Sequence, residues 1–286
     1  MTTETGGCSP AQKKTATESE IRVRTGAVIT LTGILVLYFS RYAYVLEAAA
    51  AMLSIMGIVE LLRAAKCCTW YNVLLLSLIA AAVCMRRLPY YTEILLFVWV
   101  LAIVAFALFM SRMKEIHSIG FWGILPCALM LPIFFYSAVE IRRWPQGLAV
   151  LIFVTLGCTV NDVGAYFVGR AVGTHKLAPI ISPGKTVEGG LGGMVSSVIL
   201  MGLIASLYSR CAGVEIRYGW LFLYLFLASI VGQFGDLAMS TIKRTVGIKD
   251  FSRVLPGHGG ILDRFDSILF AAPFAVLYGN MTGCFL

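Results

Sequence analysis

Residues 92–110 read TEILLFVWVLAIVAFALFM, and Glu93 is the one charged side chain among them. A helix needs about 20 consecutive apolar residues to cross the hydrocarbon core of a bilayer, with about 17–25 acceptable. The stretch is long enough, and its apolar residues are continuous rather than alternating as they are in a transmembrane β-strand. It therefore predicts one membrane-spanning α-helix.

Similar apolar stretches recur along the whole chain, separated by short polar segments. The 286 residues are 59% hydrophobic and 13% charged, whereas average soluble domains have about 45–50% apolar and about 25% charged residues. This composition excludes a soluble enzyme, and it excludes a disordered chain because disorder requires low hydrophobicity. We predict an all-α polytopic membrane protein with about nine transmembrane helices. The predicted helices cover residues 26–40, 43–62, 71–85, 92–110, 119–139, 147–169, 188–209, 218–240 and 265–282.

The sequence divides into three regions. Residues 1–25 are polar and lack the apolar core of a signal peptide, which predicts a disordered tail. Residues 26–140 are predicted to form N-terminal transmembrane helices, and residues 141–286 a C-terminal transmembrane catalytic region. With the tail inside, most of the 23 Lys and Arg residues fall on the inner side, which favours a cytoplasmic N-terminus. Two helices separate the two long polar segments, so both are predicted on the same side.

All five aspartates lie beyond residue 160, and Asp162 lies inside a predicted apolar helix. A carboxylate inside a membrane span costs roughly 2.5–3.5 kcal/mol on insertion scales, so it is expected to face a cavity, a partner or an ion. The alternative for each of the other aspartates is simple solvation in a loop.

The first polar segment contains Gly184-Lys185-Thr186, which invites a P-loop interpretation. Position 179 is Pro where a P-loop needs Gly, and no strand is predicted before it, so we reject that interpretation. Two alternatives stay open: helix-start amides near Gly189 bind a phosphate together with Lys185, or the glycines allow close helix packing. The candidate site residues of this segment are Asp162, Tyr166, Ser182, Lys185 and Glu188.

The second polar segment carries carboxylates and cations together. Asp236 and Ser240 are spaced i,i+4 and share a helix face. Asp263 and Asp266, spaced i,i+3, share another. Oxygen ligands suit Mg²⁺, whereas Lys and Arg suit phosphate oxygens, so the combination predicts metal-assisted phosphoryl or nucleotidyl transfer. The surrounding candidate residues are Lys243, Arg244, Lys249, Asp250, His258 and Arg264.

These residues resemble the signature of the phosphatidate cytidylyltransferases, also called CDP-diacylglycerol synthases. The matching positions are Ser240-x-x-Lys243-Arg244-x4-Lys249-Asp250-x5-Pro256-x-His258-Gly259-Gly260-x2-Asp263-Arg264-x-Asp266. Two upstream blocks are also similar to blocks of that family, namely Asp162…Ala165-Tyr166…Gly169-Arg170 and Ser182-Pro183-x-Lys185-Thr186-x-Glu188-Gly189. The resemblance covers residues 150–275, and Asn161 departs from it because a small or apolar residue is expected there.

The resemblance implies conversion of CTP and phosphatidic acid to CDP-diacylglycerol and pyrophosphate. It implies Mg²⁺ as cofactor, with a monovalent cation such as K⁺ as a second candidate. It implies Asp236 and Asp263 as the metal-binding pair, with Asp266 beside them. The substrate-binding residues are then Asp162, Tyr166, Ser182, Lys185, Glu188 and Ser240. The catalytic residues are Lys243, Arg244, Lys249, Asp250, His258 and Arg264.

For location and partners, the expectation is a multi-pass protein of the bacterial cytoplasmic membrane with its polar active site at the cytoplasmic face. Membrane lipids contact it, nucleic acids do not, and a homodimer is left open. One alternative is a transporter with Asp162 as its ion site, although transporters usually place such charges near the bilayer midplane. Another is a related CTP-using lipid enzyme with a different acceptor, such as a polyprenol kinase.

Overall fold

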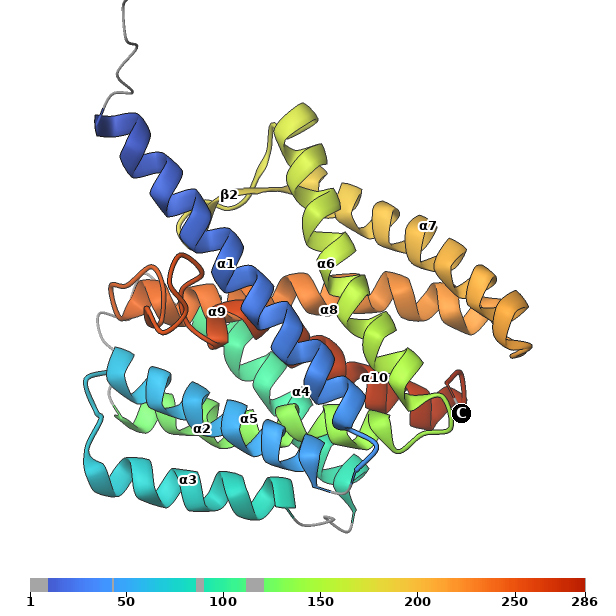
Figure 1. Cartoon of the computed structure of the whole chain (residues 1–286), viewed down its shortest axis with the longest axis horizontal. Helices are drawn as coiled ribbons and strands as arrows, with labels where there is room; N and C mark the ends of the chain where they lie inside the picture. Colours follow the sequence, from blue (N-terminus) through green and yellow to red (C-terminus); the bar gives the residue numbers. More distant parts are fainter. Residues whose placement is uncertain (1–9, 43, 86–89, 112–120, 286) are drawn as a thin grey trace, which may run out of the picture.

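The computed structural model describes residues 10–42, 44–85, 90–111 and 121–285, without the side chains of residues 10–19 and 121–123. The elements follow one another as a string of helices interrupted by one small hairpin (Figure 1). They are α1 (Pro10–Phe39), α2 (Val45–Ala64), α3 (Trp70–Met85), α4 (Tyr91–Ser111), α5 (Phe121–Arg142), α6 (Gly147–Val172), β1 (Lys176–Ala178), β2 (Ser182–Thr186), α7 (Val187–Ala212), α8 (Tyr218–Thr245), α9 (Leu262–Phe265) and α10 (Ile268–Thr282).

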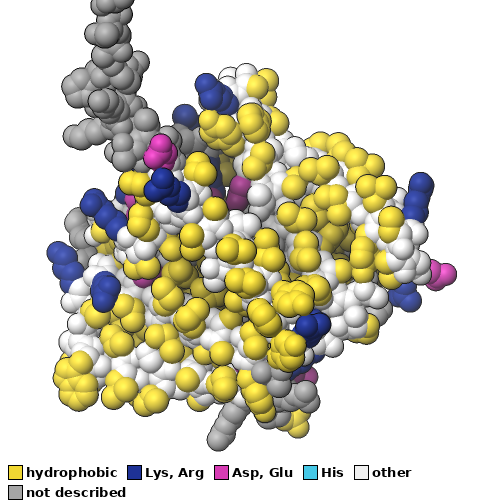
Figure 2. Space-filling view, in the orientation of Figure 1, with side chains coloured by type: hydrophobic (Ala, Val, Ile, Leu, Met, Phe, Trp, Pro, Cys, Tyr) yellow, Lys and Arg dark blue, Asp and Glu magenta, His cyan; other side chains and the backbone are white. Residues whose placement is uncertain are grey.

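The helices confirm the predicted class, an all-α polytopic membrane protein, while the count of nine spans stays a prediction. Among the described residues, seven helices are long and apolar enough to cross a membrane: α1, α2, α4, α5, α6, α7 and α8. Helices α3 and α10 are apolar but shorter. Hydrophobic side chains cover the middle of the face in Figure 2, while most Lys and Arg side chains gather near its edges. The chain is therefore a multi-pass membrane protein built mainly from α-helices.

The prediction of a disordered tail over residues 1–25 is wrong for its second part. Helix α1 begins at Pro10, so residues 10–25 are helical, while residues 1–9 lie outside the described residues. The physical reason is that a helix propagates more easily than it nucleates. The apolar part of α1 provides the nucleus, and the Ala, Gln, Lys and Glu residues before it are good helix formers.

Two further details differ from the predicted helices. The all-α description misses an antiparallel hairpin between α6 and α7, in which Lys176 pairs with Thr186 and Ala178 with Ser182. The predicted helix over 265–282 begins at Ile268 as α10, and the separate short helix α9 ends at Phe265. At the break, the backbone N–H of Ser267 donates to Asp266 Oδ1 at 2.9 Å, which gives this amide a local partner outside the regular helix ladder.

Phe270 of α10 lies at the centre of the core and is fully buried. Its ring makes edge-to-face contacts with Phe106 of α4, Phe134 of α5 and Phe234 of α8, at centroid distances of 5.8, 5.5 and 5.8 Å respectively. Aromatic pairs of this geometry contribute about 0.5–1.5 kcal/mol beyond the area that they bury. The core therefore joins helices from the N-terminal and C-terminal halves of the chain.

Candidate active site

The two polar segments meet at one end of the helix bundle, which we call the site end. The ammonium group of Lys185 on β2 forms an ion pair with the carboxylate of Asp236 on α8. Arg244 Nε, near the end of α8, donates to the carbonyl oxygen of Ile181 at 3.0 Å. The sequence-based prediction that both segments lie on the same side of the bundle is therefore confirmed.

Close packing of α6 against α7 positions Asp162. A Cβ atom added to Gly193 would lie 2.5 Å from the carbonyl oxygen of Asn161, and one added to Gly189 would lie 2.7 Å from that of Ala165. Contacts this short are not tolerated, so these positions require glycine. The amide of Gly189 donates to the Oγ1 of Thr186, the N-cap of α7, at 3.1 Å. Of the two alternatives for this glycine-rich segment, the structure supports helix packing.

Three carboxylates share one region at the site end: Asp162, Asp236 and Asp266. Ser267 Oγ donates to Asp162 Oδ2 at 3.5 Å, and the Ser267 amide binds Asp266 Oδ1. Asp236 accepts a hydrogen bond from Ser240 Oγ at 3.3 Å. Burial and, to a smaller extent, the neighbouring carboxylate of Asp236 raise the pKa of Asp266 to about 7, against the opposing effect of Lys243. The three carboxylates thus concentrate acidic groups at the site end.

Asp263 lies beside this cluster but faces the loop before α9. Its Oδ1 accepts a hydrogen bond from Lys243 Nζ at 2.8 Å. Its Oδ2 accepts from the backbone amides of Phe251 and Gly260, both at 2.9 Å. Both Lys243 and Asp263 are buried. Asp263 therefore organises the loop in this structure, and the metal pair of Asp236 and Asp263 stays a prediction.

The oxygen donors of the cluster suit a hard divalent ion. Among the described residues, no group of three or more His, Cys, Asp and Glu side chains is arranged to hold a metal. Mg²⁺ does not need such a cage, because it commonly uses one or two carboxylates together with water and substrate phosphates. The carboxylates of Asp236 and Asp266 with the Ser240 hydroxyl fit that description.

The other candidate residues lie around the cluster. Tyr166 lies one helical turn from Asp162 on the exposed face of α6, and its hydroxyl accepts from Arg170 at 3.2 Å. Ser182 begins β2 and is half-buried. Glu188 accepts from the amides of Thr174 at 3.1 Å and His175 at 3.2 Å, so it ties the end of α6 to the start of α7. The exposed residues are Arg244, Lys249, Asp250 and Arg264.

His258 lies under α1 rather than in the cluster. A Cβ atom added to Gly26 would be 3.5 Å from His258 Nε2, which shows how closely α1 crosses the loop. The Nδ1 atom of His258 is buried and has no hydrogen-bond partner among the described residues. Its catalytic role stays a prediction.

Glu60 of α2 is a residue that the sequence analysis missed. It is 3% exposed, and it binds the loop that leads into α9. The signal was present, because Glu60 is an acidic residue inside a predicted apolar helix, as is Asp162. Unlike Asp162, however, Glu60 lies far in sequence from the two polar segments that contain the other candidate residues.

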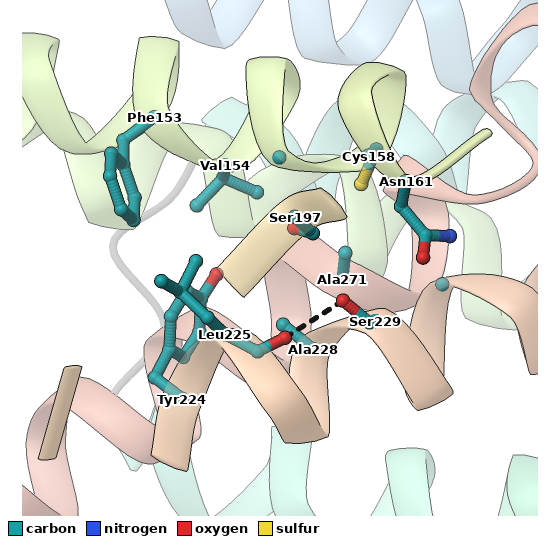
Figure 3. A pocket seen from close by; sticks show the side chains of 12 residues that line it. Phe153, Val154, Cys158, Asn161, Ser197, Tyr224, Leu225, Ala228, Ser229 and Ala271 are labelled. Atoms are coloured by element: carbon teal, nitrogen blue, oxygen red, sulfur yellow. Dashed lines mark hydrogen bonds between the residues drawn. The ribbon is translucent and has the colours of Figure 1, made fainter. Parts of the chain in front are cut away.

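Two cavities lie near the site. One, of about 20 Å³, lies among α6, α7, α8 and α10, and Asn161, Ser197 and Ser229 give it polar walls (Figure 3). Since one water needs roughly 10–15 Å³ by this kind of measure, the cavity has room for a single water. The other, of about 210 Å³, is an apolar groove of α4 and α5 that includes Ile242 of α8. Neither contains the carboxylates.

The seven membrane-length helices of the described part of the chain and the charged cluster at one end define a multi-pass membrane protein with a polar site. The chain belongs to the cytidylyltransferase family, whose model matches residues 20–282. It is similar to a Bacillus subtilis protein named phosphatidate cytidylyltransferase, with 40% identity over 183 residues, which are 64% of this chain and 65% of the relative.

Two staphylococcal proteins of the same name are also similar. The Staphylococcus saprophyticus protein is 45% identical over 128 residues, and the Staphylococcus haemolyticus protein is 46% identical over 129 residues. Each match covers 45% of this chain and 48% of the relative. The chain thus spans between about half and two thirds of the length of these curated relatives. The family resemblance found in the sequence is confirmed.

Proposed function

We propose that this protein transfers the cytidylyl group of CTP to phosphatidic acid, which gives CDP-diacylglycerol and pyrophosphate. The observation that carries the proposal is the meeting of three carboxylates with Lys185 and Lys243 at one end of a membrane-helix bundle. Carboxylates for a divalent ion beside cations for phosphates are the groups that nucleotidyl transfer needs. The names of the similar proteins support the same reaction.

The bond changes are simple. An oxygen of the phosphatidate phosphate attacks the α-phosphorus of CTP, the bond from that phosphorus to the β-phosphate oxygen breaks, and pyrophosphate leaves with the electron pair. A phosphate monoester is already an anion near neutral pH, so the reaction needs no strong general base. The task of the protein is to align two anionic substrates and to stabilise the crowded negative charge.

Named side chains supply that stabilisation. The ammonium groups of Lys185 and Lys243 would bind phosphate oxygens, since Lys185 faces Asp236 of the cluster and Lys243 faces Asp263 beside it. The guanidinium of Arg244 is fixed through its bonds to the carbonyl oxygens of Ile181 and Ile248, at 3.0 and 3.2 Å. It would add positive charge between the hairpin and α8. An aligned, fixed cation of this kind costs little reorganisation during the reaction.

Mg²⁺, when bound, supplies positive charge that stabilises the phosphate oxygens and the leaving pyrophosphate. The carboxylates of Asp236 and Asp266 would hold it, because they lie within electrostatic reach of each other and of Lys243. Asp263 remains a predicted ligand, and Lys243 would compete with the ion for its Oδ1. Asp162, near Asp236 and Lys185, would complete the negative wall of the site.

We also propose that the chain crosses the membrane nine times and that the site end faces the cytoplasm. Helices α3 and α10 would cross the bilayer together with the seven longer helices, giving nine spans. The site end would face the cytoplasm of a bacterial cell, because Lys and Arg are concentrated in the loops of that end. The acyl tails of the lipid then stay in the bilayer, while its head group meets the water-soluble nucleotide.

The test is an assay of detergent-solubilised protein for pyrophosphate release from CTP, with and without phosphatidic acid and Mg²⁺. We expect release that needs both, and a loss of about 100-fold or more in Asp236→Asn. Glu215→Gln, an exposed carboxylate change in the loop at the opposite end of the bundle, serves as the control. Pyrophosphate release that does not depend on phosphatidic acid but does depend on another lipid would show that this other lipid is the acceptor. Absence of CTP turnover with every lipid would refute the proposal.

A further inference from the structure

Glu60 is a buried carboxylate on a membrane helix, and three groups from the loop before α9 and from the start of α9 hold it. Its Oε1 accepts hydrogen bonds from Ser252 Oγ at 2.6 Å and from the Ile261 amide at 2.8 Å. Its Oε2 accepts from the Leu262 amide at 2.9 Å. Burying a carboxylate is costly unless such donors satisfy it, so this contact between α2 and the loop is specific.

The two amides are those at the start of α9, where helical N–H groups lack partners within the helix. A helix of four residues has almost no stability of its own, because nucleation is costly. The carboxylate of Glu60 supplies the missing acceptors, and its negative charge suits a helix start. Helix α9 therefore depends on a residue about 200 positions earlier in the chain.

The surface of α2 around Glu60 is shaped for this contact. A Cβ atom added to Gly57, one helical turn before Glu60, would lie 2.9 Å from Leu262 Cδ2. A Cβ atom added to Gly260 would lie 2.6 Å from Glu60 Oε1. Glycine at both positions lets the loop and α2 approach closely. The side chain and the amide of Leu262 thus both bind to one face of α2.

Helix α9 carries Asp263 and is followed by Asp266, so the place of α9 sets the place of both carboxylates. Asp263 closes the loop from within, through the amides of Phe251 and Gly260. Glu60 closes it from α2, through Ser252 and the start of α9.

We propose that Glu60 is a positioning residue of the active site, which holds α9 so that Asp266 stays near Asp236 and Asp263 stays paired with Lys243. The catalytic part of this inference rests on the proposed cytidylyltransferase function. Glu60 itself touches no reacting group, and it acts through the backbone of α9. The role requires a carboxylate, because all three groups that bind Glu60 are hydrogen-bond donors. In either orientation, the NH₂ group of a glutamine at this position would face at least one of these donors and could not accept its hydrogen bond.

The experiment compares Glu60→Gln with Glu47→Gln in the full-length protein. Glu47 lies on the same helix near the opposite end of the bundle, where it pairs with Arg143 at 3.5 Å, so it is a matched control. The first measurement is hydrogen exchange of peptides covering residues 251–266, which needs no substrate or metal. The second is steady-state turnover of CTP, with the Michaelis constant for CTP and the dependence on Mg²⁺ determined separately.

We expect Glu60→Gln to speed exchange in residues 251–266 only, and to lower turnover about 10- to 100-fold. A higher Mg²⁺ requirement should accompany this loss, with little change in the Michaelis constant for CTP. Glu47→Gln should leave both measurements near wild type. Unchanged exchange in this loop, or faster exchange throughout the protein, would overturn the positioning role. Faster local exchange with no CTP turnover in the wild type would instead refute the proposed function and leave the loop contact established.

Discussion

Lys243 and Asp263 are the most informative pair at the scale of single residues. Their charged atoms are 2.8 Å apart, and their side chains are only 10% and 3% exposed. Removing one partner of such a pair leaves an unpaired buried charge, whereas removing both charges does not. The pair therefore allows stability and catalysis to be measured separately.

We expect Lys243→Met to lower the free energy of unfolding by about 3–5 kcal/mol, because Asp263 is left buried and unpaired. Combining it with Asp263→Asn should restore part of that loss, since the buried charge is then gone. Both variants should lack turnover. The measurement is a denaturant titration in mixed micelles beside the CTP assay. A double variant as unstable as Lys243→Met alone would contradict this explanation.

The raised pKa of Asp266 predicts how the stability of the protein depends on pH. Its pKa is raised from 3.8 to about 7, so the folded protein keeps this proton over a range in which the unfolded chain has lost it. In the absence of divalent ions, the stability from this group should therefore fall as the pH rises from about 4 to about 7. The measurement is the unfolding temperature against pH in chelator, for wild type and Asp266→Asn. The variant should show a smaller decline over this range, and identical curves would contradict the prediction.

At the scale of secondary-structure elements, the α6–α7 pair determines where the first polar segment lies. Helix α6 presents Asp162, and the hairpin after α6 presents Lys185, so the spacing of the two helices affects both residues. Glycines of α7 allow that spacing, because their backbone approaches the carbonyl groups of α6. The addition of one methyl group at this contact should therefore shift the side chains of the site.

Gly193→Ala should destabilise the protein by about 1–3 kcal/mol, the usual cost of overpacking. It should also lower CTP turnover, because the added Cβ would displace Asn161 next to Asp162. Gly157→Ala on α6 is the matched control, since nothing lies within 4 Å of its added Cβ. That change should be neutral or stabilise the helix by up to about 1 kcal/mol. Equal effects of the two substitutions, in unfolding and activity measurements, would contradict the packing argument.

At the scale of the whole molecule, the sequence predicts the spans well and the long-range contacts poorly. Residues 92–110 are continuously apolar, and α4 covers Tyr91–Ser111. The number of helices between the polar segments predicts that they share one end, as the Lys185–Asp236 ion pair shows. No local pattern reports that Glu60 binds Leu262, because that contact joins distant parts of the chain. The hairpin is missed for a different reason: its strands are short, and their sequences show no alternation of apolar and polar residues.

The orientation of the whole molecule is testable with two native cysteines. Cys68 and Cys211 are both exposed. Cys68 follows α2, whose last turns contact the loop before α9, so it lies at the site end. Cys211 is near the last residue of α7, which begins at the site end and therefore ends at the opposite one. The proposed cytoplasmic site predicts opposite accessibility for these two thiols.

A membrane-impermeant maleimide should label Cys211 in right-side-out vesicles and Cys68 in inverted vesicles. Cys68→Ser and Cys211→Ser assign each signal, because each variant should lose only its own label. The reverse pattern would place the carboxylate cluster outside the cell, where CTP is not supplied. In that case CTP could not reach the site, and the proposed reaction would be refuted even if every contact within the cluster is correct.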